Sequence, residues 1–111
     1  MDKAEKEFAM KAYNSIFQPI EDAIFDTLGV DNSVLKNKVK SKIYTYSRMI
    51  FSYLCRSKGL TLQVIGCRIN KDHSTIVYYL SQYEDNYKYD KVFICLANAV
   101  MKRLKEIENG E

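Results

Sequence analysis

Four consecutive polar residues, Asp72, His73, Ser74 and Thr75, carry the side chains of this sequence that are best suited to chemistry. A carboxylate, an imidazole and a hydroxyl are the parts of a nucleophilic catalytic site. Such a site needs the three groups to face one another, whereas adjacent side chains on a helix point in different directions. We therefore expect no enzyme activity here. We expect instead a cluster of short hydrogen-bonding groups that binds a polar ligand.

Two expected helices with a short turn between them position this cluster. The first covers residues 61–69, where Thr61 is a good N-cap, and the second covers residues 73–88. In the turn, Asn70 tolerates a left-handed conformation. Two helices joined by three residues have the spacing of a helix-turn-helix, whose second helix enters the major groove of DNA. The polar cluster would then meet the edges of the bases.

The rest of the chain also shows helical periodicity, and its 111 residues contain only four Gly and one Pro. We expect an all-α fold in one compact domain: a helical extension at 1–16, a core at 17–89 and a C-terminal helix at 90–108. Pro19 can open a new helix or kink the existing one. A short helical turn capped by Asp31 or Ser33 should follow, and helical periodicity returns from about Tyr46. The apolar stripe of the C-terminal helix should dock on the core, with a partner helix or self-association as the alternative.

The charge of the chain is concentrated in its middle. Residues 1–35 carry three lysines and seven acids, a net charge of −4. Residues 36–82 carry nine basic residues and one acid, a net charge of +8, and residues 83–111 have a net charge of −1. A basic block with almost no interleaved acids favours a nucleic-acid partner. The alternative is a solvated basic face, and the acidic N-terminal segment could also mask the basic block.

A lysine occupies every second position of residues 36–42. This pattern could form an edge strand, but a basic loop fits the helical surroundings better. The three cysteines are too widely spaced for a zinc site, so we expect no metal or other cofactor. No apolar run approaches the roughly 20 residues that span a bilayer, and the charged N-terminus does not resemble a signal peptide. We therefore expect a cytoplasmic protein that does not bind membranes.

Three stretches resemble the C-terminal DNA-binding domain of DnaA-type chromosomal replication initiators. Residues 47–54 read S-R-M-I-F-S-Y-L, residues 60–66 read L-T-L-Q-V-I-G and residues 71–77 read K-D-H-S-T-I-V. The family pattern reads roughly A-R-Q-I-A-M-Y-L, then L-S-L-P-E-I-G, then R-D-H-[ST]-T-V. The resemblance covers about residues 17–88 and implies a helical domain with one helix-turn-helix preceded by a basic loop.

The resemblance assigns roles to individual residues. Base contacts in the major groove would come from Asp72, His73 and Ser74. Contacts to the DNA backbone would come from Arg48, Leu62, Gln63, Lys71, Thr75 and Tyr78. The basic loop entering the minor groove would supply Lys38, Lys40 and Lys42. The family has arginine in that groove, and lysine is more strongly hydrated and fits a narrow groove less well.

The chain has no G-x-x-x-x-G-K-[ST] phosphate loop, so we expect no nucleotide binding. We expect a free-standing relative of the initiators that binds specific double-stranded DNA in the control of replication initiation or in transcription regulation. The alternative is a protein-interaction domain that kept the initiator fold and lost its DNA site. Convergence of the basic residues on one face would favour DNA, whereas acids of the N-terminal helix covering that face would favour the alternative.

Overall fold

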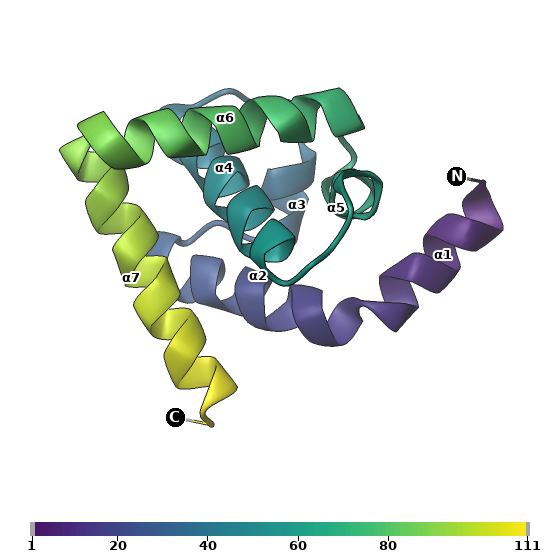
Figure 1. Ribbon diagram of the computed structural model, residues 1–111. Helices are drawn as coiled ribbons and strands as arrows, with labels where there is room; N and C mark the ends of the chain where they lie inside the picture. Colours follow the sequence, from purple (N-terminus) through teal and green to yellow (C-terminus); the bar gives the residue numbers. More distant parts are fainter. Residues whose placement is uncertain (1, 111) are drawn as a thin grey trace.

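The computed structural model describes residues 2–110, which form seven helices and no strand, as the all-α prediction requires (Figure 1). In chain order the helices are α1 (Lys3–Ala12), α2 (Asn14–Leu28), α3 (Asn32–Lys36), α4 (Lys42–Ser57), α5 (Leu62–Ile69), α6 (His73–Tyr89) and α7 (Lys91–Glu108). None of these helices is both long and apolar enough to cross a membrane.

The core lies where α2, α4, α6 and α7 meet. Three phenylalanines from different helices are fully buried there: Phe17, Phe51 and Phe93. The rings of Phe17 and Phe51 stack 6.0 Å apart. Helix α7 packs against α2 and α6 through its apolar stripe, so the predicted docking of the C-terminal helix is confirmed (Figure 1).

The first helical break falls at Tyr13 and not at Pro19. Helix α1 ends at Ala12, and the carbonyl of Tyr13 accepts the amides of Ile16 and Phe17 at the start of α2. Helix α2 then continues through Pro19, because its buried apolar face lies on both sides of the proline. The break directs α1 away from the axis of α2 and onto α5 (Figure 1).

The basic segment is shorter than the sequence suggests. Asp31 caps α3 by accepting the amide of Val34, at 3.1 Å. Helix α4 begins at Lys42, four residues before the predicted start at Tyr46, because the Ser41 hydroxyl accepts the amide of Tyr44 at the helix N-terminus. Residues 37–41 are therefore the loop between α3 and α4, and we call them the basic loop.

Helices α5 and α6 are joined by residues 70–72, so the predicted pair of helices and its three-residue turn are confirmed. Asn70 has the left-handed conformation expected of it, with φ 56° and ψ 47°. The turn packs closely on α5: a Cβ atom at Gly66 would lie only 2.4 Å from the carbonyl oxygen of Lys71. A glycine in the middle of α5 is explained by this close approach.

Candidate nucleic-acid interface

The front end of α6 is open to solvent. Asp72, His73 and Ser74 are all exposed, as a base-reading role requires. Asp72 occupies the N-cap position, where its main-chain carbonyl accepts the amides of Thr75 and Ile76. Its carboxylate makes no capping hydrogen bond to the helix. The side chain is therefore not committed to capping and can accept a hydrogen bond from a ligand.

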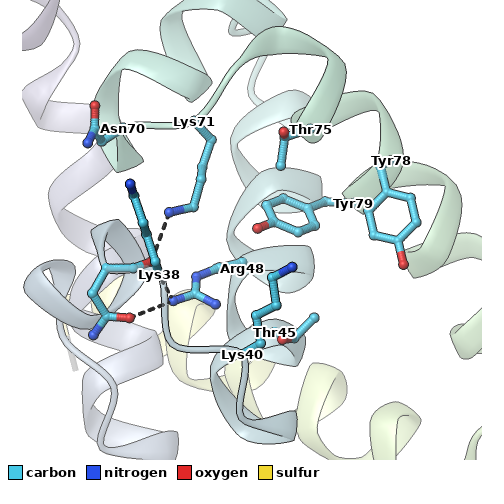
Figure 2. Close-up of a pocket in the computed structure, with 10 residues that line it drawn as sticks. Lys38, Lys40, Thr45, Arg48, Asn70, Lys71, Thr75, Tyr78 and Tyr79 are labelled. Atoms are coloured by element: carbon cyan, nitrogen blue, oxygen red, sulfur yellow. Dashed lines mark hydrogen bonds between the residues drawn. The ribbon is translucent and has the colours of Figure 1, made fainter.

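A cleft of about 480 Å³ runs from the basic loop to the first turns of α6 (Figure 2). One wall comes from the basic loop and from Thr45 and Arg48 in the first two turns of α4, and the other, distant in sequence, comes from the turn and the start of α6. The cleft brings together six residues that the sequence predicts to contact DNA outside the base-reading cluster: Lys38, Lys40, Arg48, Lys71, Thr75 and Tyr78.

Arg48 is buried, with only 2% of its surface exposed. Its guanidinium donates five hydrogen bonds of 2.8–3.0 Å to residues 34–39: to the carbonyls of Val34, Leu35, Asn37 and Val39 and to the Asn37 side chain. Two of these carbonyls lie in the last turn of α3 and two in the basic loop, where no strand partner is present, and this one side chain donates to all four. The prediction of a direct phosphate contact does not fit this placement, because the donors of Arg48 are turned inward to the loop.

Lys71 connects the turn to the basic loop. Its ammonium group donates to the carbonyls of Lys36 and Asn37, at 3.0 and 2.9 Å. Burial, together with the positive charges of Arg48 and Lys38, lowers the pKa of Lys71. An ammonium group has three donors, so one remains after these two bonds. The carbonyl of Asn37 thus accepts from both Arg48 and Lys71, which joins α4, the basic loop and the turn at one point.

The other residues predicted to contact DNA differ in how far they are exposed and in whether they line this cleft. Lys42 belongs to the first turn of α4, where its ammonium lies 5.6 Å from the centre of the Tyr46 ring, so it is not among the residues that line the cleft. At the start of α5, Gln63 is exposed and Leu62 is partly buried. Tyr78 is 54% exposed, whereas its neighbour Tyr79 is buried.

Acids that flank the basic block pair with two of its residues, Lys58 and Arg68, and with Arg103 outside it. Within residues 2–110, the ion pairs join Lys58 to Glu108, Arg68 to Glu21, and Arg103 to Asp26 and Glu106. None of these acids reaches a lysine of the basic loop. The lysines that line the cleft therefore take part in none of the ion pairs formed within residues 2–110.

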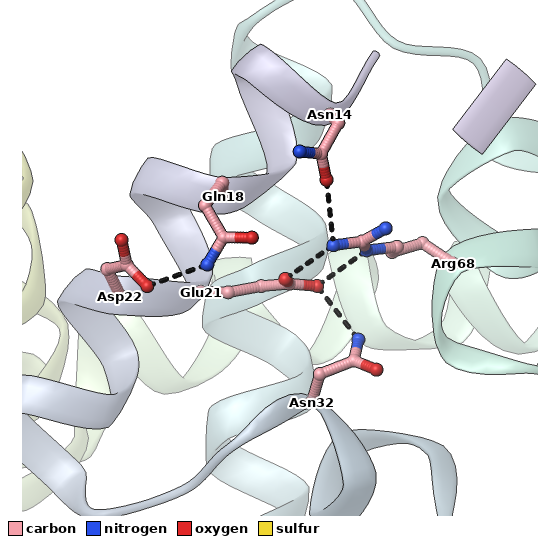
Figure 3. Close-up of polar contacts among 6 residues, drawn as sticks. All are labelled: Asn14, Gln18, Glu21, Asp22, Asn32 and Arg68. Carbon is pink, nitrogen blue, oxygen red and sulfur yellow. Dashed lines mark hydrogen bonds and ion pairs between the residues drawn. The ribbon is translucent and has the colours of Figure 1, made fainter. Parts of the chain in front are cut away.

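Arg68, a basic residue of the block, holds helices together and does not line the cleft. Its guanidinium binds both carboxylate oxygens of Glu21 at 2.7 Å (Figure 3). It also lies over the ring of Phe17. Asn32 donates to the same carboxylate, at 2.8 Å. The cluster ties α5 to α2 and α3, so it fixes the helix against which the turn and α6 are placed. Sequence reasoning missed it, although an acid at position 21 within a buried apolar stripe was a signal.

A comparison with protein families places the region that carries this site in a known family. The family model for the bacterial DnaA protein helix-turn-helix matches residues 17–82, which is more than half of the chain. The chain belongs to the DnaA helix-turn-helix family. The matched region runs from α2 into α6 and includes the basic loop, the turn and the polar front of α6. No curated protein and no solved structure matches the chain.

Membership of the DnaA helix-turn-helix family confirms the resemblance seen in the sequence and indicates DNA as the ligand. Helices α1 and α7 lie outside the region that the family model matches. Three functional features were not visible in the sequence: the buried position of Arg48, the shared carbonyl of Asn37 and the position of α1. The interior glycine of α5 was a signal for a different feature, the close approach of the turn, because glycine disfavours helices unless a close contact requires it.

Proposed function

We propose that this DnaA-type domain binds specific double-stranded DNA with the front of α6 in the major groove and the basic loop in the adjacent minor groove. The observation that carries the proposal is the cleft in which the lysines of the basic loop lie beside the exposed polar start of α6. Asp72, His73 and Ser74 would read base edges, while Lys38 and Lys40 would enter the minor groove.

Backbone contacts would come from Thr75, Tyr78 and the remaining donor of Lys71, with Leu62 and Gln63 at the start of α5 and Lys42 at the start of α4. We place the domain in the control of replication initiation or transcription, as a non-catalytic, DNA-bound regulator. No ion pair formed within residues 2–110 involves Lys38, Lys40 or Lys71. This supports DNA over a protein ligand, because lysines without an acidic partner favour phosphate.

Selection from a pool of randomised duplexes tests this function directly. We expect enrichment of a defined site, and an affinity that falls steeply with salt, with a slope set by about 4–6 phosphate contacts. If the protein binds no duplex even at low salt, the proposal fails in favour of the alternative, a protein-interaction domain.

His73→Ala is expected to cost roughly 1–3 kcal/mol of binding free energy on the selected site and less on random DNA, because a base contact is lost. Fluorescence anisotropy on both duplexes measures the two losses. Lys40→Ala is the matched control and should weaken both complexes by a similar factor. Equal losses on both duplexes for His73→Ala would show that this residue reads no base.

A further inference from the structure

A second cleft, of about 450 Å³, adjoins the turn of the helix-turn-helix and has α1 as one wall. It is lined by Lys6 of α1, residues 66–67 of α5, the turn at 70–72 and Thr75 of α6. Asn70, Lys71 and Thr75 also line the cleft that leads to the basic loop. Lys6 therefore extends the basic surface around the turn to a helix that the family model does not cover.

Packing holds α1 in this position. Ala9 is buried and α1 lies against α5, while Asp2 caps the helix by accepting the amide of Glu5, at 2.8 Å. Lys6 is exposed and belongs to none of the ion pairs formed within residues 2–110. Glu5 lines a different, more apolar groove beside Phe8. Although the N-terminal segment is acidic overall, the side chain that it places beside the turn is a lysine. At this point it therefore extends the basic surface and does not mask it.

We propose that Lys6 is a further DNA-binding residue, which contacts a backbone phosphate next to the major groove entered by α6. The proposal rests on the function proposed above. An exposed ammonium beside the open start of a 17-residue helix lies where the backbone of a duplex bound by Asp72, His73 and Ser74 would pass. The contact would raise affinity for every sequence without reading any base.

Lys6→Ala, compared with Lys11→Ala, tests the proposal. Lys11 is an exposed lysine of the same helix, but it lines a different cleft, beside Asn14 and Arg68. We expect Lys6→Ala to weaken binding to the selected site and to random duplex by the same factor. Because one fewer counterion is released, its deficit should shrink about 3.5-fold between roughly 50 and 200 mM salt. Lys11→Ala should bind as the wild type does.

The outcomes separate this proposal from the one on which it rests. If Lys6→Ala retains both wild-type affinity and wild-type salt slope while His73→Ala loses the selected site, Lys6 makes no contact but the function stands. If the wild type binds no duplex, both proposals fail. Thermal melting of each variant shows that the fold is intact, since both lysines are exposed.

Discussion

At the scale of single residues, the guanidinium of Arg48 determines the shape of the basic loop. It is planar, and its fixed donors reach four carbonyls spread over residues 34–39. Lysine carries the same charge on a single point with three donors. Replacing Arg48 by lysine therefore keeps the positive charge at this position and removes the planar set of donors.

Arg48→Lys is expected to lower the free energy of unfolding by about 1–3 kcal/mol, because loop carbonyls lose their donors. It should also weaken binding to all duplexes, since the lysines of the basic loop are no longer held beside α6. Urea titration and anisotropy measure the two effects. The exposed Lys40→Arg serves as a charge-preserving control with little effect on stability. Wild-type DNA affinity in Arg48→Lys would mean that only the charge matters and would restore the direct phosphate contact.

At the scale of the elements, the distance between α5 and the turn depends on the missing side chain of Gly66. The amide of Lys71 donates to the carbonyl of Gly66, at 2.9 Å, which brings the two backbones together. Alanine normally stabilises a helix interior relative to glycine by about 1 kcal/mol. Here its Cβ would meet the carbonyl oxygen of Lys71, an atom that cannot swing aside.

Gly66→Ala should therefore destabilise the fold, by about 1–3 kcal/mol, because the added methyl overpacks the contact. It should also reduce DNA binding by displacing the turn. Gln63→Ala, at an exposed position of the same helix, is the control for stability and should change it by less than about 0.5 kcal/mol. A raised melting temperature for Gly66→Ala would show that the turn has room to move.

The sequence predicts the helices whose patterns are local. The spacing of α5 and α6, the cap at Thr61 and the left-handed Asn70 all follow from residue types at the turn. The break at Tyr13 and the start of α4 at Lys42 cannot be predicted in this way. Core packing carries α2 through Pro19, and the alternating lysines hide the N-cap at Ser41. The inward position of Arg48 depends on carbonyls up to 14 residues away, which no periodicity encodes.

At the scale of the whole molecule, a contact between Tyr46 and Asp90 joins the middle of the chain to α7. The Tyr46 hydroxyl donates to the Asp90 carboxylate, which also accepts the amide of Phe93 at 3.0 Å. These hydrogen bonds lower the pKa of Asp90. The hydrogen bond to Asp90, burial and the aspartate charge raise the pKa of Tyr46 to about 12.

The stability that this contact contributes should fade at both ends of the pH range. The Asp90 part is present above its ordinary pKa of about 3.9 and is lost as the pH falls through the lowered value. The Tyr46 part is present below its ordinary pKa of about 10 and is lost as the pH rises from there toward 12. Chemical denaturation of Tyr46→Phe beside the wild type should show a difference that is constant near neutrality and shrinks at each extreme. A pH-independent difference would contradict the assignment.

The shared carbonyl of Asn37 has a consequence for which DNA is chosen. Because Arg48 and Lys71 both donate to this carbonyl, the distance between the basic loop and the front of α6 is fixed before any duplex binds. With this distance fixed, the duplex must present a minor and a major groove at the matching spacing. Base steps that the protein never touches would then influence affinity through their stiffness and curvature.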